Sequence, residues 1–131
     1  MLLNKPTIQT QFITMSIEEG VLICSYAKDL VVNFEIAKAI VETRREYTEG
    51  KVYPILIDMR NIKNVETKAM KYWASKEAYD NISRVAIYSN GNLISKIMIN
   101  MWFKIDKPFK PTKFFKNVGS AKLYLKSIHK N

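Results

Sequence analysis

The stretch YPILIDMR, residues 53–60, decides the fold of this chain. Its centre is an uninterrupted apolar run of Ile55, Leu56 and Ile57, and the acid Asp58 ends the run. A strand with one wet face alternates apolar and polar residues, whereas a strand covered on both faces is apolar throughout. The stretch therefore predicts a buried strand inside a sheet that is covered on both sides.

The segments before this strand predict a hairpin and a helix. Residues 10–27, TQFITMSIEEGVLICSYA, hold β-prone residues on both sides of Gly20, which permits a turn. Residues 33–50 place apolar side chains at helical spacing, with Asn33 as the expected N-cap and Gly50 at the end. We therefore expect two antiparallel strands followed by a helix.

After the central strand, helix and strand patterns alternate to the end of the chain. A second helix is expected over residues 64–82, where Met70, Trp73 and Ala74 share one side. The remaining segments are a short apolar strand (83–90), a third helix (92–105), a short aromatic strand (112–117) and a closing helix (119–131) capped by Ser120.

This succession, ββαβαβαβα, predicts an α/β fold. Strands that alternate with helices imply mostly parallel pairing and right-handed crossovers, and the opening hairpin makes the sheet mixed. We expect a sheet of about five strands with about four helices. Because no repeat, low-complexity tract or linker is visible, residues 1–131 are expected to form a single domain.

The order of elements and several landmarks resemble the STAS fold, and within it the SpoIIAA-like branch, also described as STAS/SEC14-like. The resemblance extends over residues 10–128. It is carried by the stretches FITMSIEEGVLICSYA, ILIDMRNI, AMKYWAS, RVAIYSN and KFFKNVGSAKLYL. It implies a non-catalytic regulatory or interaction module.

The resemblance also directs attention to the start of the second helix. In the best-known STAS proteins a serine in a D-S-S-G-like motif is phosphorylated at this place. Here Asp58 matches the acid that ends the strand, Thr67 is the only hydroxyl near the helix start, and the glycine is absent. A phosphate on Thr67 would be stabilised by the helix N–H groups and by Lys68. Thr67 is thus a candidate phospho-acceptor, with a solvated or capping residue as the alternative.

The third expected helix, residues 92–105, is apolar over much more than one stripe. Three interpretations stay open: a helix packed on two sides, including against a partner subunit; a helix lining an apolar ligand cavity; or a helix in contact with a membrane surface. Kinship of SpoIIAA-like proteins to lipid-carrying SEC14 domains implies the second and third. The candidate ligand or partner surface consists of Trp73, Met98, Met101, Trp102 and Phe103.

Positive charge is concentrated in the second part of the chain. Residues 1–50 carry five basic and seven acidic side chains, whereas residues 51–131 carry 16 basic and five acidic ones. Such a field attracts anions. The candidate anion-binding patch consists of Lys107, Lys110, Lys113 and Lys116. An anionic membrane suits this patch, while the lack of any RRM, KH or zinc-ligand signature disfavours nucleic acid.

The residues that enzymes use are scarce. The single histidine, His129, lies two residues from the end of the sequence, and the single cysteine, Cys24, lies in an expected strand as a buried, inert thiol. No metal-ligand cluster or glycine-rich phosphate loop is visible. We therefore expect no catalytic residues, no metal site and no cofactor.

The sequence thus predicts a non-catalytic binding module of the STAS type, acting through protein–protein contacts as a homodimer or with a partner protein. One alternative is a carrier or sensor of a lipid-like apolar molecule at an anionic membrane. A second is weak nucleic-acid binding through the basic C-terminal half. With a single cysteine and neither a signal peptide nor an apolar run long enough to span a membrane, a cytoplasmic location is expected.

Overall fold

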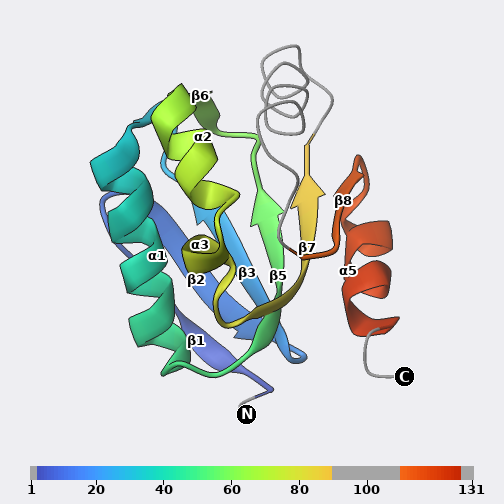
Figure 1. Cartoon of the computed structure of the whole chain (residues 1–131). Helices are drawn as coiled ribbons and strands as arrows, with labels where there is room; N and C mark the ends of the chain where they lie inside the picture. The colour runs from blue at the N-terminus through green and yellow to red at the C-terminus, as the bar shows by residue number, and fades with distance from the viewer. Residues whose placement is uncertain (1–2, 90–109, 128–131) are drawn as a thin grey trace.

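A computed structural model of the chain describes residues 3–89 and 110–127. Its main sheet has six strands in the spatial order β1-β2-β3-β5-β7-β8 (Figure 1). The strands are β1 (Lys5–Gln9), β2 (Ile13–Glu18), β3 (Val21–Tyr26), β5 (Tyr53–Asp58), β7 (Ile82–Tyr88) and β8 (Thr112–Phe115). From β3 onward neighbouring strands are parallel, so the expected mixed α/β sheet is confirmed.

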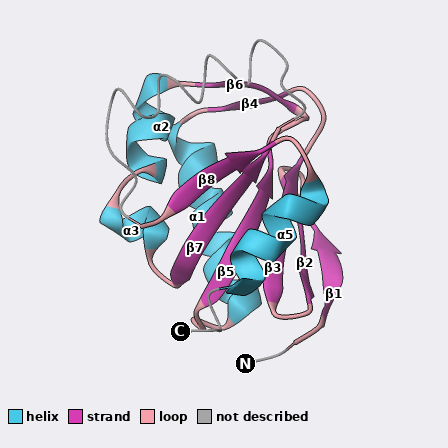
Figure 2. Ribbon diagram, turned by 90° about the vertical axis from the view of Figure 1, so that its right-hand side faces the viewer, coloured by secondary structure: helices cyan, strands magenta, loops and turns pink. Residues whose placement is uncertain are grey.

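Helices cover both faces of this sheet. Helices α1 (Phe34–Thr48), α2 (Thr67–Trp73) and α3 (Lys76–Tyr79) lie on one face, and α5 (Val118–Lys126) lies on the other (Figures 1 and 2). Among the helices of residues 3–89 and 110–127, none is long and apolar enough to cross a membrane.

Strand β5 lies between β3 and β7, as its apolar run predicts. Ile55 is opposite Leu22 on one side and Val85 on the other. The side chain of Ile55 joins the core beneath α1, α2 and α3, whereas Leu56 joins a second core that includes Leu125 of α5. Each of the two β5 residues is 3% exposed, so the strand is buried from both faces.

The predicted hairpin is formed by β2 and β3. The pairs Ile17–Leu22 and Glu18–Val21 lie next to the turn, which leaves Glu19 and Gly20 as its two connecting residues. Both have positive φ, 51° and 77°, as a tight turn with the twist of the strands requires. Glycine is favoured at the second position because it adopts this conformation without strain.

Helix α1 begins and ends at the expected signals. The Asn33 side chain accepts a hydrogen bond from the Ile36 amide (2.8 Å), which satisfies one free donor of the first turn. Glu49 and Gly50 both take positive φ at the other end. The helix places Arg44 among its buried residues, together with aliphatic side chains.

Strand β1, which the sequence pattern did not predict, lies at one edge of the sheet. It contains Pro6, which has no amide proton, and its pairing with β2 shifts register between Lys5 and Ile8. Tyr47 of α1 holds the strand in place, because its hydroxyl donates to the Pro6 carbonyl (2.7 Å) and its own carbonyl accepts from Lys5 Nζ (2.6 Å).

The expected second helix is two helices, α2 and α3. Ser75 separates them: its hydroxyl oxygen accepts from the Ala78 amide (3.3 Å) as the N-cap of α3, and its own hydroxyl donates to the Tyr72 carbonyl. A serine favours such a cap over a helix interior, because its hydroxyl competes for backbone groups.

Two further differences concern short or terminal elements. Two strands that the pattern did not predict, β4 (Leu30–Val32) and β6 (Ile62–Val65), form a separate parallel pair. The closing helix is capped by Asn117, whose side chain accepts from the Ser120 amide (3.0 Å), so the expected cap at Ser120 is wrong. The third expected helix, residues 92–105, lies outside the residues that the structure describes.

Candidate functional site

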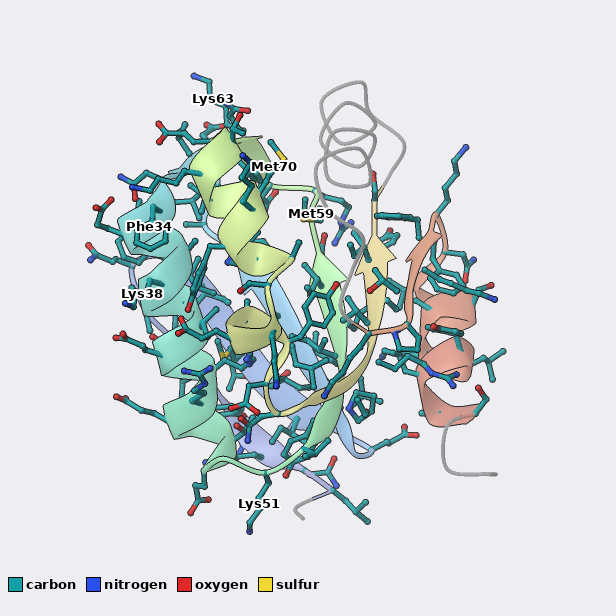
Figure 3. The ribbon with its side chains drawn as sticks, viewed as in Figure 1. Phe34, Lys38, Lys51, Met59, Lys63 and Met70 are labelled. Atoms are coloured by element: carbon teal, nitrogen blue, oxygen red, sulfur yellow. The ribbon has the colours of Figure 1, made fainter. Side chains whose placement is uncertain are left out.

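A cavity of about 50 Å³ lies between the sheet and the layer of α1, α2 and α3. The sheet contributes side chains from β2, β3, β5 and β7, and Met59, just beyond the carboxyl end of β5, adds to the wall (Figure 3). Most of the lining is aliphatic. The polar groups of the lining side chains belong to Cys24, Tyr26, Arg44, Trp73 and Tyr79.

Trp73 of α2 and Tyr26 of β3 form the aromatic part of the wall. Their rings are stacked with centroids 5.9 Å apart, and the indole N–H donates a long hydrogen bond to the Ala37 carbonyl (3.4 Å). Trp73 and Ile57 are the half-buried residues of the lining, whereas the other lining residues are buried.

Arg44 brings a cation to this apolar cavity. It lies on the inner side of α1 and is only 6% exposed. Its Nη2 donates to the backbone carbonyl of Asp80 (2.7 Å), and its Nε has no hydrogen-bond partner within residues 3–89 and 110–127. A buried polar donor without a partner is costly, and more so when it is charged. The guanidinium is thus held in the cavity wall with part of its donor capacity unused.

No carboxylate among the described residues lies within ion-pair distance of Arg44. The neighbouring Asp80 carboxylate is 3.8 Å from Arg45 instead. Burial is the main cause that lowers the Arg44 pKa, and the neighbouring cation Arg45 lowers it further. The other titratable groups near Arg44 are Cys24, Tyr26 and Tyr72.

The neighbouring thiol and phenols stay neutral at physiological pH. Burial raises the pKa of the Cys24 thiol to about 12 and raises the pKa of the Tyr26 phenol as well. Burial also raises the pKa of Tyr72 to about 12. Because none of these groups ionises near neutrality, none supplies a negative charge to Arg44. The guanidinium charge is therefore not compensated by the described side chains.

The same pKa shifts describe the chemical character of the cavity. A thiol reacts as its thiolate, and Cys24 is buried with its thiol protonated, as expected for an inert cysteine. Tyr79 is likewise held neutral, and its hydroxyl is 2.9 Å from the Thr112 hydroxyl of β8. Across residues 3–89 and 110–127, no cluster of side chains suited to a metal ion is found.

Thr67, the candidate phospho-acceptor, is the first residue of α2 and is exposed. Glu66 is the N-cap and makes no side-chain capping bond. The Lys68 ammonium lies 5.0 Å from the ring centre of Phe34, the first residue of α1 (Figure 3). Asp58, the residue that matches the strand-end acid, pairs with Arg60 at 2.8 Å. Phosphorylation of Thr67 stays a prediction.

The lysines of the candidate anion-binding patch that are described have different environments. Lys110 is half-buried, and its Nζ donates to the Ile82 carbonyl at 2.6 Å. Lys113 lies within β8, with its ammonium 5.2 Å from the centre of the Tyr124 ring. Lys116 follows the strand and is exposed. These three lysines therefore do not form one continuous stripe.

The candidate ligand or partner surface is described only at Trp73, which lines the cavity. Its other members, Met98, Met101, Trp102 and Phe103, lie outside the described residues, and so does Lys107 of the anion-binding patch. Their roles stay predictions.

The sequence did not single out Arg44 as a site residue. A weak signal was present, because Arg44 continues the apolar face formed by Ile40 and Val41 of the predicted helix. A cation at such an inward position is unusual, since arginine is rarely fully buried. That it faces a cavity depends on β3 and α3, which are distant in the sequence, and no local pattern reports this.

The order of strands, with helices on both faces of the sheet, defines the class as a SpoIIAA-like fold. An uncharacterised protein of the DUF3478 family from Shewanella loihica PV-4, whose crystal structure is described as having a SpoIIAA-like fold, matches this structure with a TM-score of 0.56 at 17% sequence identity. The match covers 95% of this chain and 97% of that chain. The expected STAS/SpoIIAA-like resemblance is therefore confirmed at the level of fold.

The chain belongs to the family described as a domain of unknown function, DUF7793, whose model matches residues 15–129. No curated protein matches the sequence.

Proposed function

We propose that this chain is a non-catalytic binding module of the STAS type that takes a small, largely apolar molecule into the cavity beneath α1, α2 and α3. The observation that carries the proposal is the cavity itself, about 50 Å³ in volume and walled mainly by aliphatic side chains. A single water needs about 10–15 Å³ of such space, so the cavity has room for a compact group of several atoms.

Binding without catalysis fits the chemistry of the lining. The one thiol in the wall, Cys24, and the two phenols, Tyr26 and Tyr79, are all held in their neutral forms by burial. A nucleophile needs a lowered pKa or an adjacent base to be activated. The raised pKa values of these groups work against such activation.

A ligand in the cavity would act on elements that are connected to the far side of the molecule. Helix α3 is only four residues long and supplies Ala78 and Tyr79 to the wall. The hydroxyl contact between Tyr79 and Thr112 joins α3 to β8, and β8 leads directly into α5. Occupancy would therefore stabilise one position of α3 against the sheet and change the surface that a partner protein meets.

A cavity-filling variant tests this proposal. Wild-type protein exposed to dissolved xenon, which enters dry apolar cavities, should show amide chemical-shift changes at lining residues such as Ile55 and Val85. Ala78→Leu fills the space and should abolish these changes, whereas Ala39→Leu, on α1 outside the lining, should keep them. A wild-type spectrum that does not respond to xenon would remove the cavity as a ligand site.

The hypotheses about the apolar segment 92–105 and about the basic C-terminal half stay predictions with their own tests. Light scattering that gives a strict monomer would argue against the homodimer. Flotation with anionic and neutral vesicles tests membrane contact through the basic patch. Nucleic-acid binding would have to weaken steeply as salt is raised.

A further inference from the structure

We infer that the molecule bound in this cavity carries a carboxylate and that Arg44 is the residue that pairs with it. This inference rests on the proposed function and names the chemical class of its ligand. Arg44 is 6% exposed and lines the cavity, and its Nε has no hydrogen-bond partner in the part of the chain that the structure describes.

The charge of Arg44 favours an anionic ligand. Asp80 offers Arg44 only its backbone carbonyl, and the Asp80 carboxylate lies 3.8 Å from Arg45. The other polar groups of the cavity wall are uncharged at neutral pH. A buried cation is stabilised when an anion joins it in the same low-dielectric space, and the cavity that Arg44 lines has room for such a group.

The geometry of the Arg44 guanidinium favours a planar anion. Nη2 of Arg44 already donates to Asp80, so the guanidinium plane is held by a bond of 2.7 Å at one end. The unpartnered Nε offers a further donor on the same plane. A planar carboxylate matches the planar guanidinium better than a spherical ion does, and such charge-assisted hydrogen bonds are stronger than neutral ones.

The charge of the cavity wall favours a carboxylate over a phosphate. Among the described residues that line the cavity, Arg44 is the one cation, and the rest of the wall is mainly aliphatic or aromatic, with the neutral groups of Cys24, Tyr26 and Tyr79. A single negative charge would be balanced there, whereas a doubly charged phosphate would keep one charge unpaired in an apolar space. The small volume further favours a short or compact acid whose apolar part lies against residues such as Ile13 and Met15.

Pairs of small molecules that differ only in charge test the inference. The probes are acetate, propionate and butyrate, each compared with the amide of the same length, titrated at constant ionic strength set with sodium chloride and followed by amide and arginine Nε–H chemical shifts. Each carboxylate should bind about tenfold to a hundredfold more tightly than its amide, and the Arg44 Nε–H signal should move.

Variants at two adjacent arginines complete the test. Arg44→Met should remove the preference for carboxylate over amide, and Arg45→Met should keep it, because Arg45 is paired with Asp80 and does not line the cavity. Equal binding of acids and amides to the wild type would overturn the inference about the acid and leave the cavity as an apolar site. Loss of the preference in Arg45→Met would also overturn it, since general surface charge would then be the cause.

Binding of neither kind of probe, together with no response to xenon, would overturn both this inference and the proposed function. Binding of xenon without any carboxylate would overturn the inference alone. If Arg44→Met fails to fold, the comparison of acids with amides on the wild type still decides between these outcomes.

Discussion

Replacing Arg44 by methionine should make the unliganded protein more stable. Methionine keeps a long, flexible apolar stem in the place of the arginine stem, so the packing of α1 against the sheet is largely kept. The substitution removes a cation that is 6% exposed and has no counter-charge among the described side chains. The change in the free energy of unfolding follows from two opposing contributions.

The unfavourable contribution is the lost hydrogen bond from Nη2 to the Asp80 carbonyl. Hydrogen bonds to charged groups contribute about 1.5–3 kcal/mol. The lower end applies here, because Asp80 is an exposed residue and water can reach its carbonyl once the arginine is gone. The favourable contribution is relief from burying an uncompensated charge, which costs several kcal/mol per ion. The net expectation is a gain of about 1–3 kcal/mol.

Urea unfolding followed by circular dichroism measures this difference, provided that the slope with denaturant is the same in both proteins. Arg45→Met is the matched control, because it removes the same charge at the next residue. The Arg45 side chain is 33% exposed and pairs with Asp80. The control should lose up to about 1 kcal/mol. If Arg44→Met is less stable than Arg45→Met, the charge of Arg44 is compensated in the unliganded protein and the reasoning about the cavity is refuted.

Three further predictions concern the core and the local signals. Burial raises the Cys24 pKa from 9.0 to about 12, so between these pH values the unfolded chain loses a proton that the folded chain keeps. The free energy of unfolding should therefore fall as pH rises, and Cys24 should contribute up to about 1.4 kcal/mol per pH unit to this fall. Cys24→Ala should lack this contribution. Parallel curves of stability against pH for the two proteins would contradict the raised pKa. Asn33→Ala should lower the free energy of unfolding by about 1 kcal/mol, while Asn33→Asp, which still caps the helix, should leave it nearly unchanged in the same urea assay. Leu56→Ala should lower the free energy of unfolding by about 2–5 kcal/mol, because it opens a cavity under α5. Leu123→Ala, at a side chain that is 72% exposed, should lower it by less than about 0.5 kcal/mol in the same thermal or urea assay. Equal losses would show that the second core contributes little.

The elements that the sequence predicted best are those whose signals are local. The apolar run at Ile55–Ile57 describes a strand covered on both faces whatever its neighbours are. The cap at Asn33 and the turn at Gly20 depend on hydrogen bonds and dihedral angles within a few residues. Interactions between residues that are close in the sequence can be predicted directly from the order of residues.

The elements that the sequence did not predict depend on distant partners. Strands β4 and β6 have three and four residues, too few to show a period, and each is a strand only because it pairs with the other. The break at Ser75 was hidden by the apolar residues around it, which continue at helical spacing into α3. Tertiary pairing and a competing hydroxyl decided these cases.

The cavity could not be predicted from the sequence, because it also depends on contacts between distant elements. Trp73 was singled out as an aromatic residue on a helix, but its place beside Tyr26 results from α2 packing across β3. Arg44 lies at helical spacing from Ile40 and Val41, but nothing local shows that the space in front of it is unfilled. A cavity is a property of the packing of several elements, so it becomes visible only when those elements are placed together.

The anchored edge strand β1 has a consequence for how copies of this protein behave at high concentration. Open sheet edges invite pairing with another chain, which leads to fibrils or amorphous precipitates. Here Pro6 offers no amide to an incoming strand, and the Pro6 carbonyl is already bonded to Tyr47. The shift in register next to it breaks the regular ladder that a second chain would have to continue. The segment that the periodic pattern failed to reveal therefore protects the sheet from growing beyond a single molecule at that side.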